Sequence, residues 1–308
     1  MISYTRILVP VDFSEPSKKA VTYGLTLAAQ ANAKLFLAHI VPDTAALNYA
    51  FPTETYETEK RQYEGAKREI LKLVPEQYAA MFDIETIVKT GRIDSELMGI
   101  VKEEAVDLVV MGTHGRKHLG RWFLGSVTER MLRKLPVPLL SVSHLGPETH
   151  AIELGFVSIR RILCATDLSD SSGTGMQYAI ELARGTGAQL TVAHVVDHAN
   201  FILLSGTASG YLEDERKKWV ESVKKKLDKL VAREKPAGME IEGLVVEGKP
   251  YEQLLRVAQE RGMDIIVLNL QSKGMLDRAF LGSTAERVVR LARVPVLSVP
   301  VALVSNAG

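Results

Sequence analysis

Hydrophobic and polar positions follow two alternating periods along the chain. Apolar runs of strand length, the first over residues 6–12, alternate with longer segments whose apolar residues recur at helical spacing, the first over residues 14–31. Ser14 stands where a helix N-cap is expected, and Pro16 falls in the first turn. The same reading predicts strands at 33–41, 82–91, 106–112 and 137–142, and helices at 54–73, 94–104 and 126–134.

The predicted order of elements is β-α-β-α-β-α-β-α-β. Strands that are almost continuously Val, Ile and Leu indicate a parallel sheet covered by helices on both faces. Right-handed crossovers then make each such unit a doubly wound, five-stranded α/β domain. Sheets of this kind bind ligands at the carboxyl ends of their strands, near the point where the strand order reverses.

The whole pattern occurs twice. "RILVPVDFSEPS" from Arg6 matches "RILCATDLSDSS" from Arg161, and a second pair of matching segments ends each half. Equivalent residues lie 155 apart at Asp12 and Asp167 and 157 apart at Gly125 and Gly282, so a net two-residue change lies between these points. We predict two tandem domains, 1–145 and 158–302, joined by a short linker around Gly146 and Pro147.

Composition restricts the classes of partner. The chain has 308 residues, of which 46% are hydrophobic, and a formal net charge of +1, which gives no general reason to expect nucleic acid as a partner. Its one cysteine, Cys164, cannot form an intramolecular disulfide and sits in an apolar strand, which fits a reducing compartment. No signal peptide and no apolar run of membrane-spanning length is evident. We therefore expect a cytoplasmic protein without a transmembrane segment.

The loop after the fourth strand, "MGTHGRKHLGRWFLGSVTERML", has the character of an anion site. Gly112 and Gly115 let the backbone approach a ligand closely, and Gly125 and Ser126 precede a helix whose first N–H groups attract anions. Around Glu129, the one acid in this region, lie Arg116, Lys117, Arg121, Arg130, Arg133 and Lys134.

A second interpretation of the same residues is structural. Ser126 and Glu129 have the spacing of a capping box, and Ser283 and Glu286 repeat it in the second half. A capping serine is compatible with neighbouring N–H groups that hold a phosphate, so the capping and ligand interpretations both stay open.

The loop matches neither a Walker motif nor G-x-G-x-x-G, but it does read G-x₂-G-x₉-G-[ST] at Gly112, Gly115, Gly125 and Ser126. With "ILVPVDFSEPS", "AHIV" and "VPLLSV", the chain resembles the universal stress protein family in its tandem form, over almost its whole length. The spaced glycines resemble the ATP-binding branch of that family. The resemblance implies a Rossmann-like, nucleotide α-hydrolase-like fold and pairing of the two repeats through their last strands as an intramolecular pseudo-dimer, and it leaves a homodimer open.

The resemblance also implies a nucleotide site in the first repeat. ATP is the implied ligand, with ADP and AMP as alternatives and Mg or Mn beside the phosphates. Pro10, Val11 and Asp12 would line the adenine and ribose end, and Val41 would hold the base through its backbone. The remaining implied contacts, at the ribose and the phosphates, are Gly112, His114, Gly115, Arg116, Gly125, Ser126, Val127 and Thr128.

The second repeat changes this loop. Asn269, Ser272 and Asp277 stand where the first repeat has three glycines. A left-handed backbone costs a residue other than glycine about 1–2 kcal/mol, so we predict one competent nucleotide site, in the first repeat. A weaker second site stays open at Asp167, Val196, Gly282, Ser283 and Thr284.

Other candidate chemistry is sparse. His39 and His194 recur at equivalent positions, and without acids or cysteines at matching spacing they are interpreted as hydrogen-bonded structural histidines, with no metal held by protein side chains. No catalytic residue is assigned. The expected function is a nucleotide-dependent regulator or binding module of the stress response. The alternatives are a slow ATP-hydrolysing enzyme and a module that binds an apolar ligand at residues 200–211, or an unidentified protein partner.

Overall fold

The computed structural model describes residues 4–42, 52–79, 82–113, 124–143, 152–153, 156–169, 172–197, 212–270 and 282–300. The chain divides into two compact units between Ser158 and Ile159. Each unit is an α/β domain with five parallel strands, as the alternating periods predicted. None of the described helices is both long enough and apolar enough to cross a membrane.

The N-terminal unit alternates strands and helices in the predicted order. Two features were not predicted: a short helix, α4, after α3, and a short antiparallel strand pair, β6 and β7, after the last of the parallel strands. The elements are β1 (Arg6–Pro10), α1 (Glu15–Ala31), β2 (Lys34–Pro42), α3 (Pro52–Leu71), α4 (Glu76–Ala79), β3 (Ile84–Gly91), α5 (Ile93–Glu103), β4 (Leu108–Gly112), α6 (Ser126–Lys134), β5 (Leu139–Val142), β6 (Ile152–Glu153) and β7 (Phe156–Val157).

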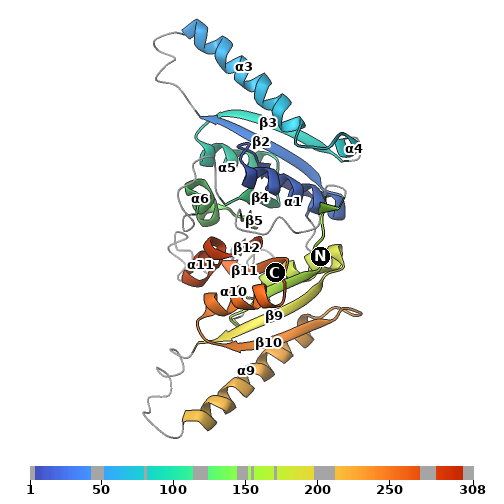
Figure 1. Ribbon diagram of the computed structural model, residues 1–308, viewed down its shortest axis with the longest axis vertical. Coiled ribbons are helices and arrows are strands. Elements are labelled where there is room, and N and C mark those ends of the chain that lie inside the picture. Colours follow the sequence, from blue (N-terminus) through green and yellow to red (C-terminus); the bar gives the residue numbers. More distant parts are fainter. Residues whose placement is uncertain are drawn as a thin grey trace. The chain divides into compact units, whose positions relative to one another are not determined.

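Its sheet has the order β5-β4-β1-β2-β3. The crossover from β3 to β4 reverses the direction in which strands are added, so the edge beyond the carboxyl ends of β1 and β4 is the switch point. Helix α1 packs on β1, β2 and β4, while α5 packs on β2 and β3 and lies beside α6, as Figure 1 shows. Ile7, Leu8 and Phe36 are fully buried between these layers.

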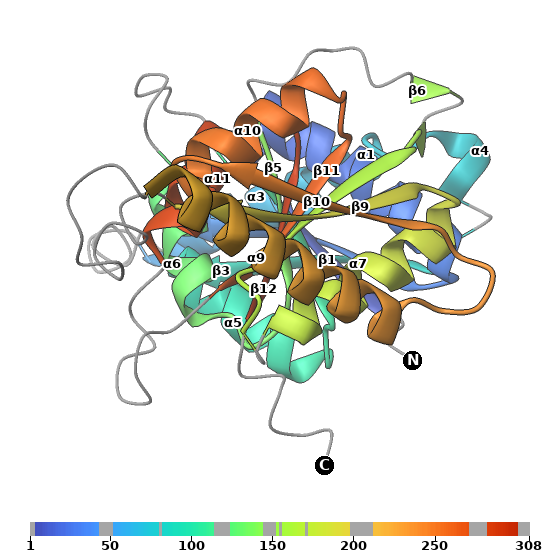
Figure 2. The ribbon, with the colours of Figure 1, turned by 90° about the horizontal axis from the view of Figure 1, so that it is seen from below.

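The C-terminal unit repeats this arrangement with sheet order β10-β9-β8-β11-β12. In Figure 2, α10 and α11 lie on one side of β9 and β10, and α7 and α9 lie on the other. The elements are β8 (Arg161–Ala165), α7 (Ser172–Thr186), β9 (Gln189–Val196), α9 (Leu212–Glu234), β10 (Ile241–Glu247), α10 (Pro250–Glu260), β11 (Ile265–Leu270), α11 (Ser283–Leu291) and β12 (Val296–Pro300).

A carboxylate fixes the start of the central strand in both units. Asp107 accepts hydrogen bonds from the backbone N–H groups of Thr5 and Arg6, at 2.7 and 3.0 Å. Asp264 does the same for Arg160 and Arg161, at 2.7 and 2.8 Å. Because the acid directly precedes β4 or β11 and the amides belong to the first residue of β1 or β8 and the residue before it, each pair sets the register of the two strands that border the switch point.

The last residues before the divide, Phe156 and Val157, contact helices of the N-terminal unit. The N–H of Val157 donates to Oγ1 of Thr26, on α1, at 2.9 Å. The centres of the Phe156 and Tyr78 rings are 4.7 Å apart. Val157 is buried. Phe156 and Val157 are therefore packed on the N-terminal unit, just before the divide at Ser158.

Candidate functional site

The aspartate at the carboxyl end of β1 builds the turn into α1. One Asp12 oxygen, Oδ1, accepts from the N–H of Ser14 at 3.0 Å and from its hydroxyl at 2.5 Å. Ser14 is in turn the N-cap of α1, as predicted. Asp167 makes the same two bonds to Ser169, at 3.0 and 2.6 Å. The turn is therefore a feature of both repeats and does not distinguish a ligand-binding half.

The residue after each aspartate has a left-handed backbone. Phe13 has φ 65° and Leu168 has φ 60°, a conformation that favours glycine and costs these residues about 1–2 kcal/mol. In both repeats the aspartate accepts hydrogen bonds from the serine that follows this residue. These hydrogen bonds close the turn and so impose the left-handed backbone.

The two repeated histidines have a structural role. His39 Nδ1 lies 2.6 Å from the carbonyl oxygen of Val11, and His194 Nδ1 lies 2.8 Å from that of Thr166. Each histidine on the second strand of its repeat thus fixes the backbone just past the first strand. This is the hydrogen-bonded role expected from the sequence.

The position implied to hold the base differs between the repeats. Val41 is the last residue but one of β2, where it pairs with Thr90 of β3, and it is partly exposed. The equivalent Val196 is only 1% exposed. Val41 is thus accessible to a ligand in the first repeat, whereas its equivalent is covered in the second.

Gly112, at the end of β4, is required by packing. A Cβ on this glycine would lie 2.8 Å from the backbone carbon of Pro16 and 2.8 Å from its Cβ, closer than real Cβ atoms approach other atoms. Pro16 is in the first turn of α1, so the glycine lets this helix lie against the strand end. Its presence has a structural reason that is independent of a ligand.

In the second repeat the small residue has moved from the strand to the helix. Asn269 replaces Gly112, and its amide lies against Gly175 of α7, where a Cβ would be 2.5 Å from Asn269 Oδ1. Gly175 takes the position of Ala20. Both polar atoms of the Asn269 side chain are buried, and neither has a hydrogen-bond partner among the described residues.

The first turn of α6 has no side-chain cap, which overturns the capping-box interpretation. The N-cap is Gly125, whose N–H donates to Thr113 O at 2.7 Å, and Ser126 is already the first helical residue. Glu129 pairs instead with Arg133 at 3.0 Å. The sequence predicted the bounds of this helix correctly but assigned the cap to Ser126, whereas the cap is the preceding residue, Gly125, which has no side chain.

The same correction holds for the second repeat. Gly282 is the N-cap of α11, again without a side-chain cap, and Glu286 pairs with Arg290 at 2.7 Å. Helix N-termini leave backbone N–H groups without intrahelical partners. In α6 and α11, among the described residues, no side chain satisfies these donors at the cap.

Thr128 is engaged within the fold. It is 2% exposed, and its hydroxyl donates to the carbonyl oxygen of Gly112 at 3.0 Å, tying α6 to the end of β4. Ala285 takes its place in the second repeat and lacks the hydroxyl. At the start of α6, Ser126 is exposed and Val127 is partly exposed.

The basic residues described around α6 form ion pairs with an acid that was not predicted from the sequence. Asp94, on the second residue of α5, is only 4% exposed. Its Oδ2 lies 3.3 Å from Arg92, 3.3 Å from Arg130 and 3.8 Å from Lys134. Burial alone would raise the pKa of Asp94, but the hydrogen bond from Arg92 and the charge of Arg130 lower it below its ordinary value. Glu129 is therefore not the sole acid among these cations.

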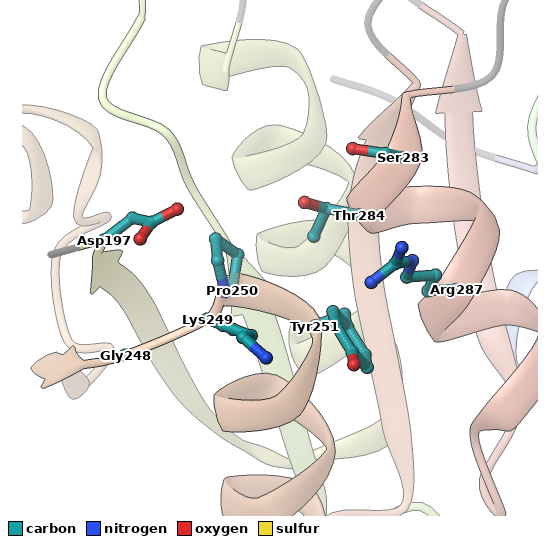
Figure 3. Close-up of a pocket in the computed structure, with 8 residues that line it drawn as sticks. All are labelled: Asp197, Gly248, Lys249, Pro250, Tyr251, Ser283, Thr284 and Arg287. Carbon is teal, nitrogen blue, oxygen red and sulfur yellow. The ribbon is translucent and has the colours of Figure 1, made fainter. Parts of the chain in front are cut away.

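An open cavity lies in the C-terminal unit, at the carboxyl ends of β9 and β10. Its volume is about 510 Å³, and the N-terminal ends of α10 and α11 face each other across it (Figure 3). The residues that line it are Asp197, Gly248, Lys249, Pro250, Tyr251, Ser283, Thr284 and Arg287.

Tyr251 organises the charges of this cavity. The guanidinium of Arg287 lies 4.7 Å from the centre of its ring, and its hydroxyl donates to Glu252 at 2.8 Å. That hydrogen bond, with the nearby Lys249, lowers the pKa of Glu252 against the opposing effect of burial. Tyr251 occupies the position of Asp94 in the repeat, and Arg287 that of Arg130.

The predicted weak second site is thus only partly assembled at the cavity. Ser283 and Thr284 line it, whereas Asp167, Val196 and Gly282 are not among its described lining residues. Cys164 contributes no reactive group, because it is buried and burial raises the pKa of its thiol to about 12.

Several predicted features lie outside the described residues. They are His114, Gly115, Arg116, Lys117, Arg121, the linker at Gly146 and Pro147, the segment 200–211, Ser272 and Asp277. Within the described part of the chain, no group of three or more His, Cys, Asp or Glu side chains is placed to hold a metal ion.

Comparison with known proteins relates both halves to one family. The sequence model of the universal stress protein family matches residues 3–143 and 158–300. Universal stress protein Rv2005c of Mycobacterium tuberculosis is 26% identical over 303 residues, covering 94% of this chain and 95% of its own. Universal stress protein MJ0531 of Methanocaldococcus jannaschii is 33% identical over 140 residues, covering 46% of this chain and 81% of its own.

A solved structure supports the fold at full length. A universal stress protein from Archaeoglobus fulgidus superposes with a TM-score of 0.66 at 21% identity, covering 97% of this chain and 99% of that one. The similarity extends through both units.

Proposed function

Because the chain belongs to the universal stress protein family, with both halves matched by its model, we propose that the first repeat binds an adenine nucleotide and acts as a nucleotide-dependent regulator in the stress response. The ligand proposed is ATP, with ADP and AMP as alternatives and Mg or Mn beside the phosphates. The proposed location is cytoplasmic. Pairing of the two repeats through their last strands stays a prediction.

The first turn of α6 carries the proposal. Its N-cap is a glycine, no side chain caps the helix, and Ser126 is exposed beside the end of β4. Backbone N–H groups in this setting, with the positive end of the helix dipole, bind phosphate oxygens. Val41 is accessible at the end of β2, two strands away, where the base would lie.

The cations near α6 are proposed to act through long-range charge. Arg130 and Lys134 are partly neutralised by Asp94, and Arg133 by Glu129. Direct phosphate contacts are therefore assigned to the α6 backbone, and Thr128 would contribute its N–H, because its hydroxyl is bonded to Gly112. Pro10, Val11, Asp12, Gly112, His114, Gly115 and Arg116 keep their proposed places around the ribose and the first phosphate.

The proposal is tested by placing a carboxylate at the helix start. In Ser126→Glu the new acid lies at the first helical position, where it stabilises a helix by roughly 0.3–1 kcal/mol but competes with phosphate for the N–H groups. We expect the Kd for Mg-ATP, measured by titration calorimetry, to rise at least about tenfold, a change of about 1.4 kcal/mol.

The matched control adds the same charge elsewhere. Gln30→Glu lies on the exposed C-terminal end of α1 and should leave the Kd unchanged. Equal affinity in Ser126→Glu and the unaltered chain, or no binding of ATP, ADP or AMP by the unaltered chain, would reject the site.

A further inference from the structure

Helix α9 presents a row of positive charges on its exposed side. Its apolar residues Val223, Leu227 and Val231 are buried where the helix packs on β9 and β10 (Figure 1). Residues three or four positions apart lie on one face of a helix. Away from the sheet, one such row consists of Lys218, Ser222, Lys225, Lys226, Lys229 and Arg233, all of them exposed. We call this row the α9 stripe, and its length along the helix is about 22 Å.

The cations of the α9 stripe have almost no acids to balance them. Its four lysines form no ion pair and no hydrogen bond with any described residue. Among its cations, only Arg233 is paired, 2.7 Å from Glu234. Like charges three or four positions apart on a helix destabilise it. The stripe therefore lowers the stability of the unit that carries it, and the fold alone does not explain its charges.

The first repeat does not have this stripe. At the equivalent positions, 157 residues earlier, Glu69 stands in place of Lys226 and Glu76 in place of Arg233. Glu69 forms an ion pair with Lys72 at 2.6 Å. Three cations are thus set against two acids in the first repeat, where the second repeat has five cations. The excess of positive charge belongs to the second repeat and is not a requirement of the repeated fold.

The two borders of the α9 stripe differ from each other. On one side Glu221 and Asp228 are exposed, three or four positions from Lys225. On the other side Trp219 and Leu230 are partly exposed. Cationic side chains beside a partly exposed apolar border are typical of helix edges that pack against a second, acidic helix.

These borders favour a narrow protein partner over other polyanions. A flat anionic membrane would meet Glu221 and Asp228 together with the lysines, and those acids would be repelled by its charge. Single-stranded nucleic acid is bound in basic grooves whose aromatic side chains stack on successive bases. The stripe lies on the convex surface of a helix, and Trp219 is the one aromatic residue of α9. A second helix needs neither a plane nor a groove.

We propose that the α9 stripe is a docking surface for an acidic, amphipathic helix of a protein partner. The carboxylates of such a helix recur once per turn, at about 5.4 Å, which is also the interval between the cations of the stripe. The carboxylates lie against the lysines, and the apolar residues of the partner pack on Trp219 and Leu230. The surface belongs to the second repeat and does not depend on the nucleotide site of the first.

The probe is a synthetic helical peptide of about 20 residues, long enough to form a helix by itself, with glutamate once per turn on one face and leucine on the adjoining face. Binding of the fluorescently labelled peptide to the full chain is followed by anisotropy. We expect saturable binding that weakens at least about tenfold between about 20 mM and about 200 mM salt, because salt screens exposed charges. A peptide of the same composition with its glutamates distributed around the helix should bind at least about tenfold more weakly.

Two double variants test the position of the charges. Lys226→Glu with Arg233→Glu restores the two acids of the first repeat, so two attractive contacts become repulsive and binding should weaken at least about tenfold. Lys217→Glu with Lys224→Glu is the matched control, because it makes the same change in charge at exposed positions on the other side of the same helix. The control should change the affinity less than about threefold.

The thermal midpoint, measured by circular dichroism, establishes that each variant is folded. Three results would overturn the proposal. The first is an absence of saturable peptide binding at low salt, and the second is an equal loss of affinity in the two double variants. The third is tighter binding of a single-stranded oligonucleotide, or of vesicles that contain phosphatidylserine, than of the peptide.

Discussion

The turn before α5 and the turn before α10 share a backbone and differ in chemistry. Gly91 and Gly248 both have positive φ, 151° and 132°, and the N-caps that follow, Arg92 and Lys249, have φ of −75° and −72°. The second helical residue is then a buried aspartate in one repeat and a tyrosine in the other. The aspartate pairs with the arginine of the neighbouring helix in the first repeat, whereas in the second repeat that arginine lies over the tyrosine ring.

The ends of β4 and β11 differ in a complementary way. In the first repeat the strand has the glycine and α1 has Pro16 and Ala20, whereas in the second repeat the strand has Asn269 and α7 has Gly175. The space between strand and helix is filled from opposite sides. The replacement of Gly112 by Asn269 is therefore matched by a smaller residue on the facing helix, in addition to being a change at a candidate binding site.

The largest expected effect is on stability, and it comes from adding a side chain at Gly112. Gly112→Ala places a Cβ against backbone atoms of Pro16, which cannot move without displacing α1, so we expect a loss of about 1–3 kcal/mol in the free energy of unfolding. The measurement is urea unfolding followed by circular dichroism.

Gly175→Ala is the matched control in the other repeat. There the new Cβ meets the amide of Asn269, a side chain that can rotate, and alanine favours the helix by about 0.8–1.0 kcal/mol over glycine. The change should therefore be close to neutral. If both variants lose the same stability, the assigned packing difference is wrong.

A smaller and pH-dependent effect is expected at Asp94. Because its pKa is lowered in the folded protein, its ion pairs stabilise the fold above the ordinary aspartate pKa of about 3.9 and cease to do so as the pH falls through the lowered value. Asp94→Asn should therefore have a lower thermal midpoint than the unaltered chain at pH 7.

The difference in thermal midpoint should shrink as the pH is taken below 4, where the unaltered aspartate also becomes protonated. Tyr251→Asn is the control at the equivalent position, and its effect should not change over the same interval. A constant difference for Asp94→Asn from pH 7 to pH 3 would contradict the assigned ion pairs.

The repeated fold could be predicted because its signals are local. Apolar periodicity placed the elements, and the bounds of α6, Ser126–Lys134, were predicted to the residue. The cap was missed because a serine followed by a glutamate three positions later fits the capping-box pattern. That pattern does not show whether the serine is the cap or the first residue of the helix. Only the backbone geometry distinguishes a glycine cap from a serine cap.

The charges and the close packing could not be predicted because they join distant segments. Asp94 and Arg130 are 36 positions apart and meet only because α5 and α6 pack side by side. The requirement for Gly112 comes from Pro16, on another element. A signal was nonetheless present, because aligning the repeats sets Asp94 opposite Tyr251 and Pro16 opposite Ser171.

The central claim, that the two repeats keep one fold but only the first binds an adenine nucleotide, is tested most directly by titrating Mg-ATP into the full chain while backbone amide signals are followed in both halves. The account predicts saturation at one ATP per chain, with shifts at Ser126 and Val127 and none of comparable affinity at Ser283 and Thr284. Shifts confined to Ser283 and Thr284, or equal and simultaneous shifts in both repeats, would contradict it.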